Sequence, residues 1–112
     1  MTTGSVSTVK PTEHGEIWWA QLKKRRPIII VGRDDLRGRR LRTTVASVSS
    51  TVRDLPSELL LDEGDGLAGT CAANCEELMT IDKTRLINRI GSLSETKLAE
   101  LHEALAFALQ LD

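Results

Sequence analysis

The residues with the clearest chemical potential are basic, and they gather in one part of the sequence. Nine of the 15 Lys and Arg residues lie between Lys23 and Arg42, where only Asp34 and Asp35 carry the opposite charge. A second segment, residues 54–77, contains seven acidic residues and no basic one. A basic cluster of this kind can bind phosphate groups even though the net charge of the chain is −1. Both charged runs could equally be solvated surface, and charge alone does not separate these two interpretations.

Few other groups are candidates for catalysis or metal binding. The sequence has no Gly-rich phosphate loop, no Ser-centred nucleophile elbow and no cluster with metal-ligand spacing. We expect His14 and His102 to be unremarkable residues rather than a catalytic pair. Cys71 and Cys75 are interpreted as small buried hydrophobic residues, because a C-x₃-C pair without further Cys or a nearby His is a weak metal signal. Trp19 could stack on a nucleic-acid base or pack in the core, and both remain open.

These groups must be positioned by a fold that is mainly β. Runs of β-branched and alternating apolar residues, separated by Gly, Pro and charged residues, predict short strands. A turn is expected at residues 62–66, since Gly supplies the positive φ that tight turns require. The predicted strands cover residues 16–22, 27–31, 41–49, 58–61, 70–74, 79–82 and 87–93.

One helix is expected, at the end of the chain. Ser94 can cap it by accepting a backbone N–H, and Glu95 lies in the first turn, where the helix dipole favours an acid. Leu98, Leu101 and Leu105, followed by residues 108 and 109, share one face at spacings of three and four. Many short strands followed by a terminal helix predict a small, closed or half-closed β-barrel that carries a helix.

Length and composition limit the number of domains, the kind of core and the class of protein. A chain of 112 residues suits one domain, and with 3% aromatic residues its core must be mostly aliphatic. No apolar run approaches the ~20 residues needed to cross a bilayer, and no secretory signal is visible, so we expect a soluble, cytoplasmic protein without a membrane partner. Residues 1–14 are rich in Ser and Thr and predict a disordered tail, which leaves 15–112 as the folded domain.

Several segments, taken in order, resemble the MazF/PemK family of toxins from type II toxin–antitoxin systems. They are GEIWWAQL, RRPIIIV, TTVASVSST, LPSELLL, NCEELMTIDKTRL and RIGSLSETKLAELHEAL, and together they run from Gly15 to about Leu111. The resemblance implies a plug-like, SH3-related β-barrel with a C-terminal helix, assembled as a homodimer. It also implies a sequence-specific endoribonuclease without a cofactor or metal. Such an enzyme cleaves single-stranded RNA by 2′-hydroxyl attack, leaves 2′,3′-cyclic phosphate and 5′-hydroxyl ends, and arrests growth unless a MazE-like antitoxin blocks it.

The resemblance also assigns site residues. The family's catalytic Arg, which directly precedes the Pro of the second strand, falls on Arg26. The family's hydroxyl residue at the end of the third strand falls on Ser49, or on Ser50 or Thr51 if the register slips. Arg26 is expected to stabilise charge on the scissile phosphate, and Ser49 to donate a hydrogen bond to it. The residues that we expect to bind RNA are Lys24, Arg25, Arg53 and Trp19.

One segment departs from the family, and two other functions compete with the first. Many relatives have a long loop between the first two strands that grips RNA, whereas here Leu22 is followed only by a short basic link before Arg26.

The first alternative function is a non-catalytic SH3-like binding module that uses the basic stretch for docking. The second is a toxin directed at gyrase, like the related CcdB toxins. The C-terminal sequence Leu109-Gln110-Leu111-Asp112 differs from the Trp-Gly-Ile-like tail of those toxins.

Overall fold

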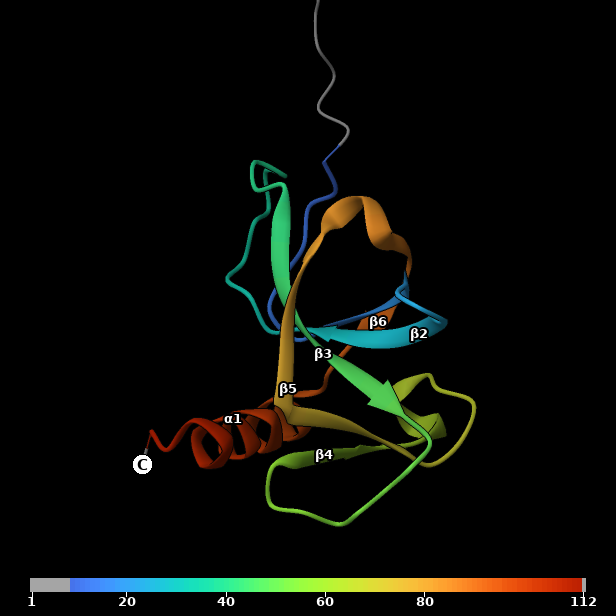
Figure 1. Cartoon of the computed structure of the whole chain (residues 1–112), viewed down its shortest axis with the longest axis vertical. Coiled ribbons are helices and arrows are strands. Elements are labelled where there is room, and N and C mark those ends of the chain that lie inside the picture. Colours follow the sequence, from blue (N-terminus) through green and yellow to red (C-terminus); the bar gives the residue numbers. More distant parts are fainter. Residues whose placement is uncertain (1–8, 112) are drawn as a thin grey trace, which may run out of the picture.

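The computed structural model describes residues 9–111, which form a curled β-sheet and one long helix (Figure 1). The expected class, mainly β with a C-terminal α-helix, is therefore confirmed. No helix in this described range is long and apolar enough to span a membrane. The elements are β1 (Glu16–Gln21), β2 (Arg25–Ile30), β3 (Arg42–Ser49), β4 (Glu58–Leu61), β5 (Cys71–Asp82), β6 (Leu86–Ser92) and α1 (Glu95–Leu109), with short 3₁₀ helices at Glu63–Asp65 and Lys83–Arg85.

The six strands form one antiparallel sheet in the order β4-β5-β3-β2-β1-β6. Its register shifts between Ala46 and Val48, where residues 74–77 of β5 lie opposite Ser47 alone. Extra residues on one strand bend it and increase its twist, and a second set of shifts does the same between β1 and β6. The sheet curls as a result, but its outer strands β4 and β6 do not pair with each other, so the barrel is half-closed.

The prediction of two separate strands at 70–74 and 79–82 is wrong, since both belong to the single 12-residue strand β5. Glu76 and Glu77 interrupt the apolar pattern between them and suggested a break in the strand. In the structure both side chains are exposed at the register shift, where the strand bends without ending. The second strand also begins earlier than expected, because Arg25 and Arg26 pair with Gln21 and Ala20 of β1.

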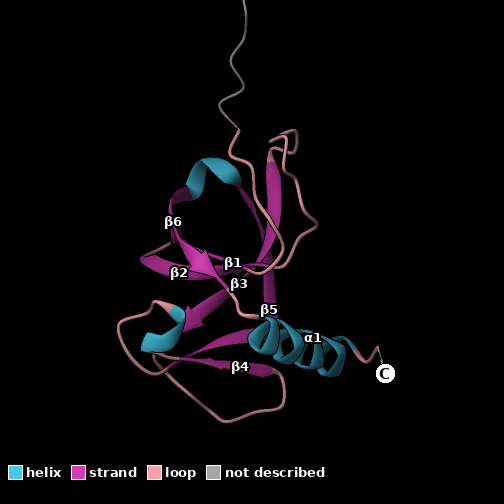
Figure 2. Ribbon diagram, turned by 180° about the vertical axis from the view of Figure 1, so that it is seen from behind, coloured by secondary structure: helices cyan, strands magenta, loops and turns pink. Residues whose placement is uncertain are grey.

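Two apolar cores lie on opposite faces of the sheet. The first contains Ile17, Ile29, Val48 and Leu59, and α1 covers it (Figure 2). The helix buries Leu101, Ala104 and Leu105, and the predicted cap is confirmed because the Ser94 hydroxyl accepts a hydrogen bond from the Lys97 amide at 3.2 Å. The second core, on the other face, consists of Trp18, Ala20, Ile28, Ile30, Val45, Ile81 and Leu86.

The N-terminal segment is more ordered than expected from residue 9 onward, while residues 1–8 of the predicted tail lie outside the described range. Thr12 is 1% exposed and pairs with Asp35 through two backbone hydrogen bonds. The Asp35 carboxylate contacts the buried Lys83 ammonium at 2.6 Å, and that ammonium also donates to the Lys10 carbonyl. Hydrogen bonds from Lys83 and the Arg40 amide lower the pKa of Asp35 from 3.8 to about 2. The buried Lys83–Asp35 ion pair therefore holds residues 9–14 against the folded domain. The polar composition of the predicted tail gave no sign of this contact.

Candidate active site

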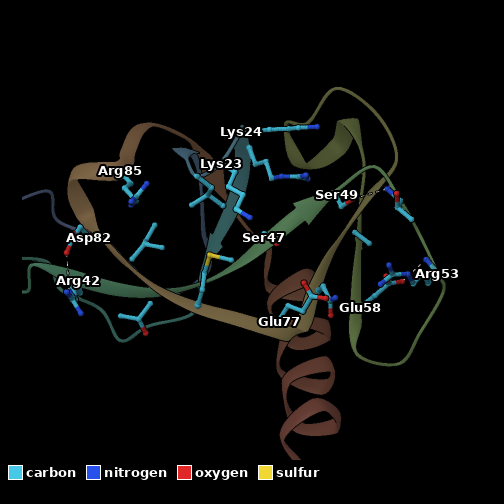
Figure 3. A pocket seen from close by; sticks show the side chains of 18 residues that line it. Lys23, Lys24, Arg42, Ser47, Ser49, Arg53, Glu58, Glu77, Asp82 and Arg85 are labelled. Carbon is cyan, nitrogen blue, oxygen red and sulfur yellow. Dashed lines mark hydrogen bonds and ion pairs between the residues drawn. The ribbon is translucent and has the colours of Figure 1, made fainter.

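A cavity of about 830 Å³ opens on the face of the sheet that carries the second core (Figure 3). Leu22 and Ile81 of that core line its wall, so the cavity begins where the apolar packing ends. Arg42, Asp82 and Arg85 lie at one end of it, and Ser49 and Arg53 lie at the other (Figure 3). The site is thus a polar continuation of the interior of a half-closed barrel.

Strand register explains why Arg26 and Ser49 reach this cavity together. Ile28 of β2 pairs with Ser47 of β3, and extending that register by two residues places Arg26 across from Ser49. Because side chains alternate between the two faces of a strand, residues 26 and 28 point to one side, as do residues 45, 47 and 49. Ile28 and Val45 fill the second core, whereas Arg26, Ser47 and Ser49 line the cavity beyond it.

The side chains of Arg26 and Ser49 are available to a ligand. No hydrogen bond or ion pair within residues 9–111 engages the Arg26 guanidinium, and the side chain is half-buried. The Ser49 hydroxyl oxygen accepts a hydrogen bond from the Thr51 amide at 3.1 Å, which leaves its own proton free to be donated. A guanidinium and a hydroxyl group in one cavity can both donate to the oxygens of a phosphate.

The cavity has a strongly cationic lining. Arg42 is paired with Asp82 at 3.1 Å, and Arg85 donates to the Gln21 carbonyl at 3.1 Å. The side chains of the remaining basic residues have no hydrogen-bond or ion-pair partner within the described part of the chain. The six basic residues of the lining are Lys23, Lys24, Arg26, Arg42, Arg53 and Arg85. The lining also contains three acidic residues, Glu58, Glu77 and Asp82, so basic residues outnumber acidic ones by six to three. Four cations without an ion-pair partner around a concave surface favour an anionic, extended ligand.

Glu58 organises the loop that follows Ser49. One of its carboxylate oxygens accepts hydrogen bonds from the backbone amides of Arg53 and Leu55, at 3.0 and 3.3 Å. The same loop contains Asp54 at φ +56°, a left-handed conformation that Asp tolerates better than most residues. Glu58 therefore holds Arg53 at the edge of the cavity as a positioning residue.

The structure brings most of the expected site residues together, but not all of them. Arg26, Ser49, Thr51, Lys24 and Arg53 line the cavity. Arg25 does not, because its guanidinium lies 5.7 Å from the centre of the Trp19 ring, and neither residue belongs to the lining. Ser50 is exposed outside the lining as well. Arg25 and Trp19, which the sequence suggested as RNA-binding residues, thus form a cation–π pair outside the cavity.

Other lining residues were not expected from the sequence. They include Lys23, Arg42, Ser47, Glu58, Asn74 and Arg85. Arg42 lies opposite Asp82 through the pairing of β3 with β5, and Glu58 lies opposite Asn74 through the pairing of β4 with β5. Alternation along β3 could have indicated Ser47, since it shares a face with Ser49. No group of three or more His, Cys, Asp or Glu side chains suited to a metal ion occurs among the described residues.

Comparison with known proteins identifies the family. A model of the PemK-like, MazF-like toxins of type II toxin–antitoxin systems matches residues 13–109. The chain belongs to this family. It is 32% identical over 98 residues to the probable endoribonuclease MazF5 of Mycobacterium tuberculosis, covering 85% of this chain and 90% of that protein. It is 36% identical over 93 residues to endoribonuclease MazF3 of the same species, covering 83% and 90%.

Solved structures agree with this assignment. The M. tuberculosis toxin MazF-mt6 superposes with a TM-score of 0.82 at 35% identity, covering 87% of this chain and 98% of that one. A mycobacterial endoribonuclease in complex with its cognate antitoxin has a TM-score of 0.80 at 22% identity, covering 90% and 97%, and supports the fold. The expectation of a MazF-like endoribonuclease toxin is therefore confirmed, and it takes precedence over the binding-module and gyrase-directed alternatives.

Proposed function

We propose that this MazF-like toxin cleaves single-stranded RNA in the cationic cavity, with Arg26 and Ser49 as its catalytic residues. The observation that carries the proposal is their placement in one cavity with both donor groups unengaged. The neighbouring free cations would hold the flanking phosphates, and the sheet face would hold the bases. Family membership supplies the reaction class, and the shared cavity supports the choice of Arg26 and Ser49.

In this mechanism the 2′-hydroxyl of one nucleotide loses its proton as its oxygen attacks the adjacent phosphorus, and the 5′-oxygen of the next nucleotide leaves and takes up a proton. The products are a 2′,3′-cyclic phosphate and a 5′-hydroxyl. Negative charge grows on the phosphate in the transition state, so the Arg26 guanidinium and the Ser49 hydroxyl stabilise it by donating hydrogen bonds. Arg26 acts as a cation rather than as a base, because the pKa of an Arg side chain lies above about 12.

The same cavity would be the target of an antitoxin. An acidic segment of a MazE-like antitoxin would compete with RNA for the unpaired Lys23, Lys24 and Arg53. We also propose that the toxin works as a homodimer, for which exposed apolar side chains such as Phe107 and Leu109, at 53% and 51% exposure, offer contact area. Its site of action would be the cytoplasm, where single-stranded mRNA is available.

The test is incubation of purified toxin, free of antitoxin, with a long unstructured RNA in the presence of a chelator. Fragment ends are mapped and identified chemically, and Arg26→Ala is treated in parallel. We expect discrete cuts with 2′,3′-cyclic phosphate ends, and a loss of about 10²–10³ in rate for the variant. Arg42→Ala is a matched control, since Arg42 lines the same cavity but is already paired with Asp82. Cleavage by a folded Arg26→Ala protein at the normal rate would contradict the assignment.

A further inference from the structure

Two histidines far from the cavity contact each other directly. The Nε2 atoms of His14 and His102 lie 2.8 Å apart, although the residues are 88 positions apart in the sequence. The ring centres are 5.1 Å apart and the ring planes differ by 22°, so the two rings meet edge to edge, nearly in one plane. His14 precedes β1 and His102 lies on α1, and the endoribonuclease mechanism uses neither residue.

The contacts of His14 fix the direction of this interaction. Its Nδ1 atom lies 2.9 Å from the Val31 carbonyl oxygen, which only accepts hydrogen bonds, so Nδ1 carries a proton. In the neutral ring the Nε2 atom then has a lone pair directed at His102, whose Nε2–H donates to it. The backbone amide of His14 also donates to an Asp34 carboxylate oxygen at 2.8 Å. The His14 imidazole is thus held in a single tautomer with its Nε2 lone pair directed at His102.

We propose that His14 and His102 form a two-histidine binding site for a divalent transition metal of the zinc type. Imidazole nitrogen is a preferred ligand of zinc, copper and nickel. Ligating histidines usually donate their second ring N–H to a backbone carbonyl or a carboxylate, as His14 does to Val31. That arrangement exists before any metal binds, so little reorganisation is needed at His14.

Binding would require a small rearrangement at His102. The His102 proton must move from Nε2 to Nδ1, and Nδ1 has no hydrogen-bond partner within residues 9–111 that would oppose this. Zn–N bonds of about 2.0 Å in a tetrahedral shell place two nitrogens about 3.3 Å apart, so the rings must separate slightly from their 2.8 Å contact. His102 is exposed on α1 and is free to turn.

The surroundings can complete the coordination shell. A second cavity of about 440 Å³ adjoins His14 and is lined by Val31, Arg33 and Asp34, which gives room for water ligands. The Asp34 carboxylate lies in this lining together with Arg33, and it accepts the hydrogen bond from the His14 amide. Two protein ligands make a weaker site than the four of a structural zinc centre. We therefore expect an exchangeable metal rather than a permanent one.

Metal at this site would join the segment before β1 to α1. Only the folded chain brings positions 14 and 102 together, so a metal held by both residues stabilises the native state by mass action. The thiols of Cys71 and Cys75 do not compete for the metal, because both are buried. Burial raises the pKa of the Cys75 thiol to about 11, and the pKa of Cys71 is raised as well.

The test uses the full chain without a histidine affinity tag, titrated with ZnCl₂ and NiCl₂ by calorimetry and followed by thermal unfolding. MgCl₂ is the control, because this hard cation prefers oxygen ligands. We expect one zinc or nickel ion per chain and a rise in melting temperature, with no effect of magnesium. His102→Gln keeps an amide donor towards His14 Nε2 and removes the metal ligand, so its metal-free melting temperature should stay close to that of the wild type while binding is lost.

His14→Gln is the second variant, and it should lose binding in the same way. The proposal is overturned if the wild type binds neither zinc nor nickel, or if the folded variants bind them as well as the wild type does. RNA cleavage is not the readout, so the result is independent of the proposed catalytic site.

Discussion

The dependence of RNA binding on salt follows from the cavity lining. Four of the six basic side chains there, those of Lys23, Lys24, Arg26 and Arg53, have no partner in the described part of the chain. Each phosphate contact to single-stranded nucleic acid releases counterions and contributes about −0.7 to the slope of log K against log salt. Four contacts give a slope of about −3, or a loss of about 50-fold in affinity between 50 and 200 mM salt.

The assay is equilibrium binding of 2′-O-methylated RNA, which lacks the attacking hydroxyl and stays intact. Affinity is measured at several salt concentrations for the wild type, Lys24→Ala and Arg42→Ala. Lys24→Ala should reduce the slope by about 0.7, since one contact is lost. Arg42→Ala should change it less, because Arg42 is already paired with Asp82 at 3.1 Å. A slope near zero in the wild type, or one that Lys24→Ala leaves unchanged, would refute the interpretation of the cavity as a phosphate-binding surface.

Three further predictions concern individual side chains. Ser49→Ala should lower kcat by about 10²–10³ in a single-turnover cleavage assay, whereas Thr51→Ala should leave it near the wild-type value; the reverse result would mean that the hydroxyl assignment is displaced. Glu58→Ala should raise KM for RNA, because the Arg53 and Leu55 amides lose their acceptor, and Glu58→Gln, which keeps an acceptor oxygen, should restore it. Asp35→Asn should destabilise the fold in denaturant titrations above about pH 4. The pKa of Asp35 is lowered from 3.8 to about 2, so its contribution is lost as pH falls through that range, and the wild-type and variant curves should converge near pH 2. A pH-independent difference would contradict this origin.

Local sequence patterns were sufficient for most of the fold. Ser94 begins the helix as expected, the strand at Glu58–Leu61 has its predicted bounds, and Gly66 ends the short 3₁₀ helix at φ +92°. A helix cap, an alternating strand pattern and a turn residue are all set by residues close together in the sequence, so each can be predicted locally. The single strand β5 was missed because exposed Glu76 and Glu77 look like a break unless the bend opposite Ser47 is known.

The candidate site was predictable only in part, for a similar reason. Arg26 and Ser49 were indicated by the family resemblance, and both line the cavity. Arg25 differs from its neighbour Arg26 by one position, which places it on the other face of β2 beside Trp19. Counting charges along the basic stretch cannot separate Arg25 from Arg26. It also gives no sign that His14 contacts His102. The first depends on β2 extending back to Arg25 through its pairing with β1, and the second on contact between residues 88 positions apart.

Strand alternation also explains why the proposed catalytic residues lie outside the apolar core. The side of β2 and β3 that buries Ile28 and Val45 also carries Arg26, Ser47 and Ser49, but these polar residues lie past the end of the apolar core. Burying an unpaired guanidinium inside that core would be costly, whereas the half-buried Arg26 side chain at its open end remains accessible to water. Substituting Arg26 or Ser49 therefore removes no core contact, and a loss of cleavage in these variants reports on the site itself.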